Sequence, residues 1–405
     1  MKIAVFHNLP SGGAKGALYN FVKYLTNSGH LVDVFVPSTA DENFLPLKEV
    51  ANKVYVFPVR KTITGLIYST FCYIPPIKIS LRDLERTQKE IADAINKKDY
   101  NVVLSEQDQY TMSPFFLKFI EKPTIYYCQQ PLRLNEAILQ KISQKSEYKD
   151  QIVLVRRILR KLWRKWITNR LPEIDKKNAS FAGYILTNSY FSRENILRSY
   201  GLNSFVCYLG VDTNVFKPLE ISKENFVLSV GSCYPSKGFD FIIKSLARID
   251  SKIRPKFIIV SNSVDVGWKN YLEELANKIG VKVEIKNLIS NNELLQLYNK
   301  AKLVVYAPYL EPFGLVPLEA MACGTPVVAV REGGVRESVI HDETGILTER
   351  DEDMFAQAVS ELLLNNVKRE RMAKRCIEVI HNFWTLKHAG ERLLNHLNRA
   401  MEVLK

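Results

Sequence analysis

Short apolar runs alternate with segments of helical periodicity along the whole chain. Near the start, a strand-like run at 3–6 leads to a Gly12-Gly13 turn, a helical pattern over 17–27 and an alternating strand at 31–36. Further strands of this first series are predicted at 54–57, 102–104, 124–127, 184–186 and 205–208. Helical stretches separate most of these strands.

A second series begins after Lys217-Pro218, with strands predicted at 226–230, 256–260, 281–285, 303–306 and 327–330. Alternating strands and helices indicate parallel sheets covered on both faces. We therefore expect an α/β protein with two doubly wound, Rossmann-like domains that face a cleft, which is the default active site. The domains predicted are 1–208, 209–384 and a C-terminal helix at 385–405, which packs on its own domain or crosses back to the first.

Composition adds one feature to this picture, a localised positive charge. The 405 residues are 46% hydrophobic and 24% charged, which is ordinary for globular domains, but their net charge is +13. Residues 151–177 hold nine Lys or Arg against two acids, with Trp and Leu at helical spacing. This pattern predicts a basic amphipathic helix, which either contacts an anionic membrane surface or packs on the first domain with a solvated basic face. No recognised nucleic-acid module accompanies it, so we expect no nucleic-acid partner.

Targeting and redox signals favour the cytoplasm. The six cysteines are scattered without a Cys-x-x-Cys pair, which favours a reducing compartment and supports neither a disulfide framework nor a zinc site. No secretory signal is recognisable at the N-terminus. The longest apolar run, 63–79, is broken by Gly65, Pro75 and Pro76, and is interpreted either as core or as an apolar loop for a lipid acceptor. A cytoplasmic protein that can lie on the inner face of the membrane is expected.

The densest chemical motif runs from Glu311 through Gly314 to Glu319 and on to Pro326. Gly314 permits close approach of a ligand to the backbone, and a helix that begins near Leu315 directs its amides at an anion such as a diphosphate. The Glu311 carboxylate precedes that helix and the Glu319 carboxylate lies within it, so that one of them can reach a sugar and the other a ribose. Two glutamates eight residues apart would, by themselves, more often be solvated surface side chains.

With its flanking segments, this motif resembles the Glu-x7-Glu segment of glycosyltransferase family 4, whose members are retaining enzymes with the GT-B fold. Other segments match in order and spacing, and a Tyr-Tyr-Cys-Gln-Gln-Pro run resembles a segment of mannosyltransferase-like members. The matching segments are Pro10–Lys15, Gly29-His30, Thr187–Ser189, Gly210–Asp212 with Phe216 and Pro218, Gly231 with Lys237-Gly238, Gly333-Gly334, Glu337, Gly345 and Tyr126–Pro131.

The resemblance assigns roles on the donor side. Glu319 would bind the ribose of the donor nucleotide, Glu311 would hold the transferred sugar, and Lys237 would neutralise the departing diphosphate. Glu311 and Lys237 are the catalytic candidates. The remaining donor-binding candidates are Phe313, Gly314, Leu315, Val316, Gly231 and Ser232, where the family commonly has an arginine at the position of Ser232.

On the other side, the resemblance implies a phosphate or acceptor loop of Gly12, Gly13 and Lys15. The family often has a basic residue at the position of Gly16 and a histidine after the strand at 102–104. In this chain either Glu106 or Asp108 substitutes for that histidine, or the role is missing. His7, Asp108 and Gln129 are the candidates for the acceptor side. His7 can equally be an ordinary hydrogen-bonded histidine, and the aromatic residues near Gln129 can equally be core.

The expected activity is transfer of a hexose, such as mannose or glucose, from a nucleotide-diphosphate sugar to a glycan or lipid-linked acceptor. The family mechanism implies retention and needs no metal, so neither a cofactor nor a metal site is expected. The single Asp-x-Asp match, Asp351-Glu-Asp353, is interpreted as the start of a helix. A dinucleotide site is disfavoured because the first loop lacks Gly-x-Gly-x-x-Gly, and no P-loop occurs. The alternatives are a nucleotide-sugar epimerase of the same architecture and a non-catalytic protein that binds sugar nucleotides or membranes.

Overall fold

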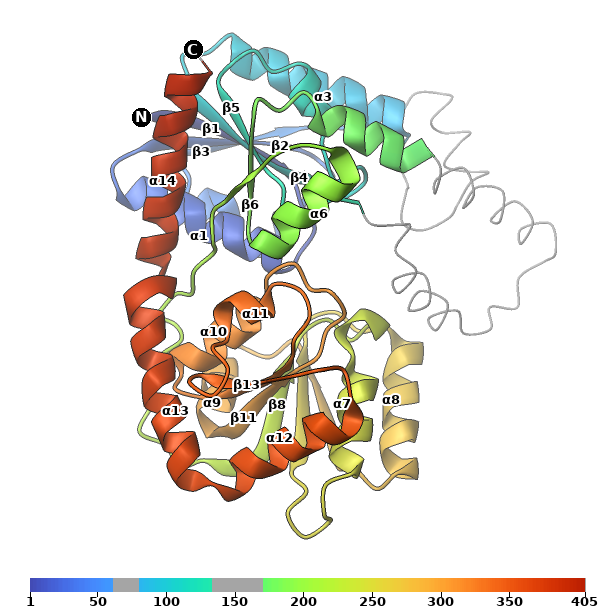
Figure 1. Ribbon diagram of the computed structural model, residues 1–405. Helices are drawn as coiled ribbons and strands as arrows, with labels where there is room; N and C mark the ends of the chain where they lie inside the picture. The colour runs from blue at the N-terminus through green and yellow to red at the C-terminus, as the bar shows by residue number, and fades with distance from the viewer. Residues whose placement is uncertain (61–79, 133–169, 405) are drawn as a thin grey trace, which may run out of the picture. The chain divides into compact units, whose positions relative to one another are not determined.

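The computed structural model describes residues 1–60, 80–132 and 170–404 (Figure 1). These residues form two compact units. Unit 1 holds the described residues up to Leu209 together with those from Leu386 onward, and unit 2 holds Gly210–Thr385. Each unit contains one parallel sheet with helices on both faces, which confirms the predicted α/β class.

Unit 1 is built on a parallel sheet in the order β3-β2-β1-β4-β5-β6-β7. In β1, Ile3 pairs with Val32 of β2 on one side and with Val102 of β4 on the other. Every residue of β4 is buried, because helices cover both faces of the sheet. The strands are β1 (Lys2–Asn8), β2 (Leu31–Pro37), β3 (Lys53–Phe57), β4 (Val102–Asp108), β5 (Thr124–Tyr127), β6 (Tyr184–Thr187) and β7 (Phe205–Val206).

The helices of unit 1 divide between the two faces of its sheet. On one face, α3 packs with Phe6, Phe35 and Val103, and Ser80 caps its first turn by accepting from the Asp83 amide. The opposite face is covered by α1 and α14, which contact each other. The helices are α1 (Gly13–Asn27), η1 (Leu47–Glu49), α3 (Leu81–Asn96), η2 (Phe115–Lys118), a helix over 170–179, α6 (Tyr190–Tyr200) and α14 (Leu386–Val403).

Helix α14 shows that the amphipathic C-terminal pattern returns to the first unit rather than packing on the second. A Cβ at Gly390 would overlap the ring of Tyr24, so the glycine allows α14 to approach α1 closely. Leu393 and Leu397 follow on the same buried face. The side chain of Arg392 donates to the carbonyl of Tyr208 at 3.4 Å, which ties this helix to the end of unit 1's last strand.

Unit 2 has a six-stranded parallel sheet in the order β10-β9-β8-β11-β12-β13. Its edge strand β13 was not predicted, because its apolar run is only Ile346-Leu347, shorter than the run of any strand that was predicted. The strands are β8 (Glu224–Val230), β9 (Lys256–Ser261), β10 (Val283–Asn287), β11 (Ala301–Tyr306), β12 (Val327–Val330) and β13 (Gly345–Thr348). The helices are η3 (Pro235–Lys237), α7 (Phe239–Ala247), α8 (Val266–Lys278), α9 (Asn291–Lys300), α10 (Leu315–Ala322), α11 (Val335–Ser338), α12 (Glu352–Leu364), α13 (Asn366–Val379) and η4 (Ile380–Trp384).

Two details of the sequence prediction can be compared with these elements. The interpretation of Asp351-Glu-Asp353 as a helix start is confirmed, because Asp351 caps α12 and accepts from the amides of Asp353 and Met354. The segment 63–79 and residues 151–169 of the basic segment lie outside the described residues. Within the described part of the chain, no helix combines the length and apolarity that a membrane span requires.

Candidate functional site

The site in unit 2 lies where its strand order reverses. Strands β8 and β11 are hydrogen-bonded neighbours, and the chain leaves their carboxyl ends toward opposite sides of the sheet. Parallel sheets bind ligands at such a switch point, because the loops diverge there and leave an opening between them. The loop after β8 carries Gly231 and Lys237, and the loop after β11 carries Glu311 and Gly314.

Lys237 and Glu311 form an ion pair across this switch point. The Nζ atom of Lys237 lies 2.7 Å from Oε2 of Glu311, and the two side chains are 24% and 27% exposed. Gly231 lies beside the lysine stem, since a Cβ at this glycine would be in van der Waals contact with Cδ of Lys237 at 3.5 Å. The structure thus brings together the two catalytic candidates and leaves both accessible to a ligand.

Helix α10 begins directly after this ion pair with its first amides uncapped by a side chain. Gly314 is the N-cap residue with φ of 95°, and a Cβ there would lie 2.8 Å from the hydroxyl of Tyr306. Leu315 and Val316 are partly exposed in the first turn, whereas Phe313 is buried against Trp384. The backbone and the positive end of the helix are therefore available to an anion in front of Glu311.

Glu319 lies on α10, on the second turn, and is oriented by a tyrosine that sequence reasoning missed. The hydroxyl of Tyr298, a fully buried residue of α9, donates to Oε2 of Glu319 at 2.6 Å. Burial raises the pKa of Glu319, against the opposing effect of this hydrogen bond. The only signal for Tyr298 in the sequence was an aromatic residue in an amphipathic helix, which is indistinguishable from ordinary core.

Two glycines after β12 bring a third loop against the Glu311 loop. The amide of Gly334 donates to the carbonyl of Glu311 at 2.9 Å. A Cβ at Gly333 would overlap this carbonyl, and one at Gly334 would overlap that of Pro312. The Gly333-Gly334 pair is therefore required for close backbone contact rather than for flexibility.

Ser232 occupies the position where the resembled family commonly has an arginine. It is partly exposed beside Gly231, and its carbonyl accepts from the amide of Tyr234 at 2.8 Å. Its hydroxyl is small and uncharged. Lys237 is thus the cation that the loop after β8 supplies at this edge of the sheet.

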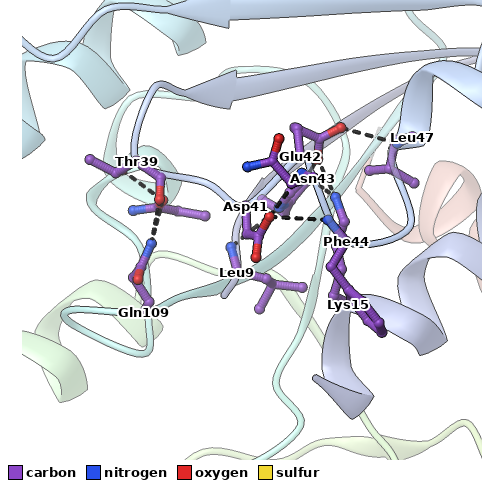
Figure 2. A network of polar contacts seen from close by, with 11 residues as sticks. Leu9, Lys15, Thr39, Asp41, Glu42, Asn43, Phe44, Leu47 and Gln109 are labelled. Carbon is purple, nitrogen blue, oxygen red and sulfur yellow. Dashed lines mark hydrogen bonds and ion pairs between the residues drawn. The ribbon is translucent and has the colours of Figure 1, made fainter. Parts of the chain in front are cut away.

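In unit 1, the corresponding switch point lies between β1 and β4, where Lys15 is held by an ion pair. Lys15 of α1 and Glu42 of the loop after β2 bond to each other (Figure 2). Nε2 of His7 lies 3.0 Å from Oε1 of Glu42. The other carboxylate oxygen of Glu42 accepts from the amide of Leu47 at 3.0 Å. The side chains of His7 and Lys15 are fully buried. The charge of Lys15 is thus compensated inside the unit.

The protonation of this cluster follows from its contacts. Burial lowers the pKa of His7 to about 4, and the hydrogen bond to Glu42 only partly offsets this effect. Because the amide of Leu9 donates to Nδ1 at 3.2 Å, the neutral ring carries its proton on Nε2 and donates to Glu42. Although burial opposes it, hydrogen bonds from His7 and Lys15 lower the pKa of Glu42 to about 2. A neutral histidine thus accompanies a charged pair.

The other two acceptor-side candidates are buried and hold neighbouring segments together. Asp108 accepts from the side chains of Asn8 and Gln88 at 2.6 and 2.7 Å and from the amides of two following residues. Gln129 donates to Oε2 of Glu106 at 3.3 Å and reaches the carbonyl of Ala14 at 3.5 Å. Both side chains therefore position the loops at this edge of the sheet.

Gly12 and Gly13, unlike these buried residues, are accessible at the start of α1. Gly12 caps α1 with φ of 141° and no side-chain bond, and Gly13 is the first helical residue. Among the described residues, no heavy atom apart from their chain neighbours lies within 4 Å of a Cβ placed on either glycine. Open space beside two amides at a helix start suits an anion, so in unit 1 the backbone is more accessible than Lys15.

A metal site was not predicted. In the ranges 1–60, 80–132 and 170–404, no three His, Cys, Asp or Glu side chains gather as metal ligands.

Among the comparisons with known proteins, the family match falls within unit 2. Residues 211–379 match the family model described as glycosyl transferases group 1. An uncharacterized glycosyltransferase of Methanocaldococcus jannaschii is 30% identical over 184 residues, which are 45% of this chain and 46% of that protein. A D-inositol 3-phosphate glycosyltransferase of Stackebrandtia nassauensis is 30% identical over 213 residues, 48% of each chain. The chain thus spans about half the length of the curated relatives it matches.

Solved structures match nearly the whole fold. Anabaena HepE in complex with UDP-glucose aligns with a TM-score of 0.71 and 19% identity, over 98% of this chain and 100% of that one. Sucrose-phosphate synthase of Thermosynechococcus elongatus aligns with a TM-score of 0.72 and 18% identity over the full length of both chains. WaaG, a glycosyltransferase involved in lipopolysaccharide biosynthesis, aligns with a TM-score of 0.65 and 14% identity over 98% of this chain and 99% of that one. These similarities show that both units have the fold of glycosyltransferases.

Proposed function

We propose that the protein is a retaining glycosyltransferase that moves a hexose from a nucleotide-diphosphate sugar to a glycan or lipid-linked acceptor without a metal ion. The observation that carries this proposal is the Lys237–Glu311 ion pair of 2.7 Å directly in front of the uncapped start of α10. The match of residues 211–379 to the glycosyl transferases group 1 model supports it, since this range contains both residues.

The proposed chemistry follows from the charges around the switch point. The bond between the anomeric carbon and the phosphate oxygen breaks while a bond from the acceptor oxygen forms on the same face of the sugar. The acceptor proton passes to the leaving phosphate, whose growing charge is stabilised by Lys237 and by the backbone at Gly314 and Leu315. Glu311 would hold sugar hydroxyls and Glu319 the ribose. In unit 1, the backbone amides at Gly12 and Gly13 would bind either a phosphate group or the acceptor.

UDP-glucose is the first donor to test, because a protein of the same fold binds it; GDP-mannose is the second. Incubation of the protein with each donor, followed by measurement of nucleotide release and of the sugar formed, separates three functions. Transfer requires an acceptor, whereas an epimerase gives a changed sugar without one. A non-catalytic binder gives a thermal shift on nucleotide addition but no turnover. Either of the last two results would replace the proposal.

Replacement of Glu319 tests the donor site by binding alone. Glu319→Ala is expected to weaken nucleotide binding roughly tenfold or more, because it removes charge-assisted hydrogen bonds to the ribose. Tyr298→Phe should weaken binding less, since it removes only the bond that orients the carboxylate. Titration calorimetry with UDP and GDP measures both effects. Glu274→Ala, an exposed acid of α8, is the matched control; equal affinity in all variants would rule out this role for Glu319.

The basic segment 151–177 leads us to place the acceptor at an anionic membrane surface and the enzyme on its cytoplasmic side. Neutralisation of four basic residues, Arg156, Arg157, Arg160 and Lys161, should reduce binding to phosphatidylglycerol vesicles by up to about a thousandfold, because each charge near the surface contributes about 1 kcal/mol. Co-sedimentation measures this change, and neutral phosphatidylcholine vesicles are the control. Unchanged sedimentation with anionic vesicles would favour the alternative that this helix packs on unit 1.

A further inference from the structure

Arg350 joins three loops at the carboxyl edge of the unit 2 sheet. It follows β13, and its guanidinium forms a two-pronged ion pair with Glu332 of the loop after β12, with Nε and Nη2 each 2.7 Å from a carboxylate oxygen. Nη1 donates to the carbonyl of Ala307 at 3.0 Å and Nη2 to that of Pro308 at 2.9 Å. Both carbonyls belong to the segment that leads from β11 to Glu311.

Two aromatic rings pack against the guanidinium of Arg350. Its carbon lies 3.8 Å from the ring centroid of Tyr309 and 5.3 Å from that of Phe241. The side chains of Arg350 and Glu332 are 16% and 23% exposed, so that solvent competes weakly for their hydrogen bonds. A planar group with a fixed fork of donors fits this arrangement, whereas a lysine ammonium does not.

These contacts argue against Arg350 as a second phosphate-binding cation. Its four hydrogen bonds use four of the five N–H groups of a guanidinium. The charge is already paired with Glu332. Its donors are thus committed to the protein.

The segment 307–311 is held at further points. The amide of Tyr309 donates to the carbonyl of Ser236 at 2.9 Å, which joins this segment to η3, where Lys237 lies. The carbonyl of Glu311 accepts from Gly334 at the far end. Gly238 packs directly on the Ala307 carbonyl that Arg350 also binds, because a Cβ there would overlap that oxygen. The position of Glu311 relative to Lys237 therefore depends on a short segment whose start is fixed by Arg350.

We infer that Arg350, paired with Glu332, is a positioning residue for Glu311. It acts through the backbone of 307–309 and sets the geometry of the Lys237–Glu311 pair without touching substrate. This inference rests on the proposed function for its effect on turnover. Its effect on the loop is independent of the reaction and is measured separately.

Arg350→Lys tests the inference, because lysine keeps the charge but loses the two-pronged pair and the stacking. We expect kcat of the folded protein to fall roughly tenfold, while the affinity for UDP changes less than about twofold, since a displaced catalytic group costs turnover more than binding. Deuterium exchange at the amides of 309–311 should rise about tenfold. Arg248→Lys is the matched control, because Arg248 is exposed and its side-chain hydrogen bonds go to two acids, Glu352 and Asp353, outside the segment 307–311.

A double-mutant cycle separates positioning from general stability. In the Glu311→Gln background, Arg350→Lys should change kcat by less than about twofold, whereas independent effects would multiply. The inference would be overturned if the kcat effects of the two substitutions multiplied, or if Arg350→Lys changed neither kcat nor deuterium exchange. In either case, sugar transfer by the wild-type protein would still uphold the proposed function. A wild-type protein that transfers no sugar from either donor refutes the proposed function. Deuterium exchange at the amides of 309–311 in Arg350→Lys then still tests whether Arg350 holds this segment in place.

Discussion

Lys237→Ala is expected to lower kcat for sugar transfer by about a hundredfold or more and to change donor affinity much less. Removal of one preorganised group that stabilises developing charge costs on the order of a hundredfold to a thousandfold in turnover. The lysine already lies 2.7 Å from Glu311, so little reorganisation is required when the diphosphate leaves. Steady-state kinetics with UDP-glucose or GDP-mannose, with UDP binding measured separately, resolve the two effects.

Two further variants complete this experiment. Lys237→Arg keeps a cation and should recover part of kcat. Lys244→Ala on the adjacent α7 removes a lysine whose Nζ lies 4.0 Å from Asp240, and it should leave turnover within about twofold of wild type. If Lys237→Ala turned over as fast as Lys244→Ala, the ion pair with Glu311 would be structural and the proposed role in catalysis wrong.

Glu106→Gln is expected to stabilise the protein at alkaline pH and to leave its stability unchanged near pH 5. Glu106 is completely buried on β4, and within the described residues its Oε1 atom has no hydrogen-bond partner. Burial raises the pKa of this carboxyl to about 8, against the hydrogen bonds from Gln129 and the Gln107 backbone. The folded protein therefore carries a neutral acid here at neutral pH.

The sign of the effect follows from proton binding. The ordinary pKa of a glutamate is 4.5, so between pH 4.5 and about 8 the folded state binds one more proton at Glu106 than the unfolded state. Stability is therefore fully present below pH 4.5 and lost as the pH rises to 8. At about 1.4 kcal/mol per pH unit, Glu106→Gln should gain on the order of 4 kcal/mol relative to wild type between pH 5 and pH 8.5.

Urea unfolding at these two pH values measures the difference. The opposite contribution of His7, which favours folding as the pH rises from 4 to 6.5, cancels because both proteins contain it. Glu90→Gln, an exposed glutamate of α3, is the control and should show no such pH dependence. A constant difference between Glu106→Gln and wild type at both pH values would mean that Glu106 is ionised in the folded state.

The elements and the donor motif were predictable because their signals are local. Apolar runs separated by helical patterns predicted nearly all strands of both sheets, since each buried strand needs apolar residues on both faces. The Glu311–Glu319 segment, with a glycine at the helix start, follows β11 and contains α10, as its pattern predicted. The strand β13 was missed because only two consecutive apolar residues, Ile346 and Leu347, mark it.

The sequence by itself thus determined the fold class, the order of strands and the residues at the switch point of unit 2. Only the tertiary structure decided what those side chains do to one another. Lys15 was expected to face a ligand, yet Glu42, 27 residues later, neutralises it inside unit 1. Tyr298 orients Glu319, and Arg350 fixes the segment before Glu311 from a position just after β13, the strand that the sequence did not reveal. Such partners are far apart in the chain, and the burial that sets their charges and hydrogen bonds exists only after both sheets have formed.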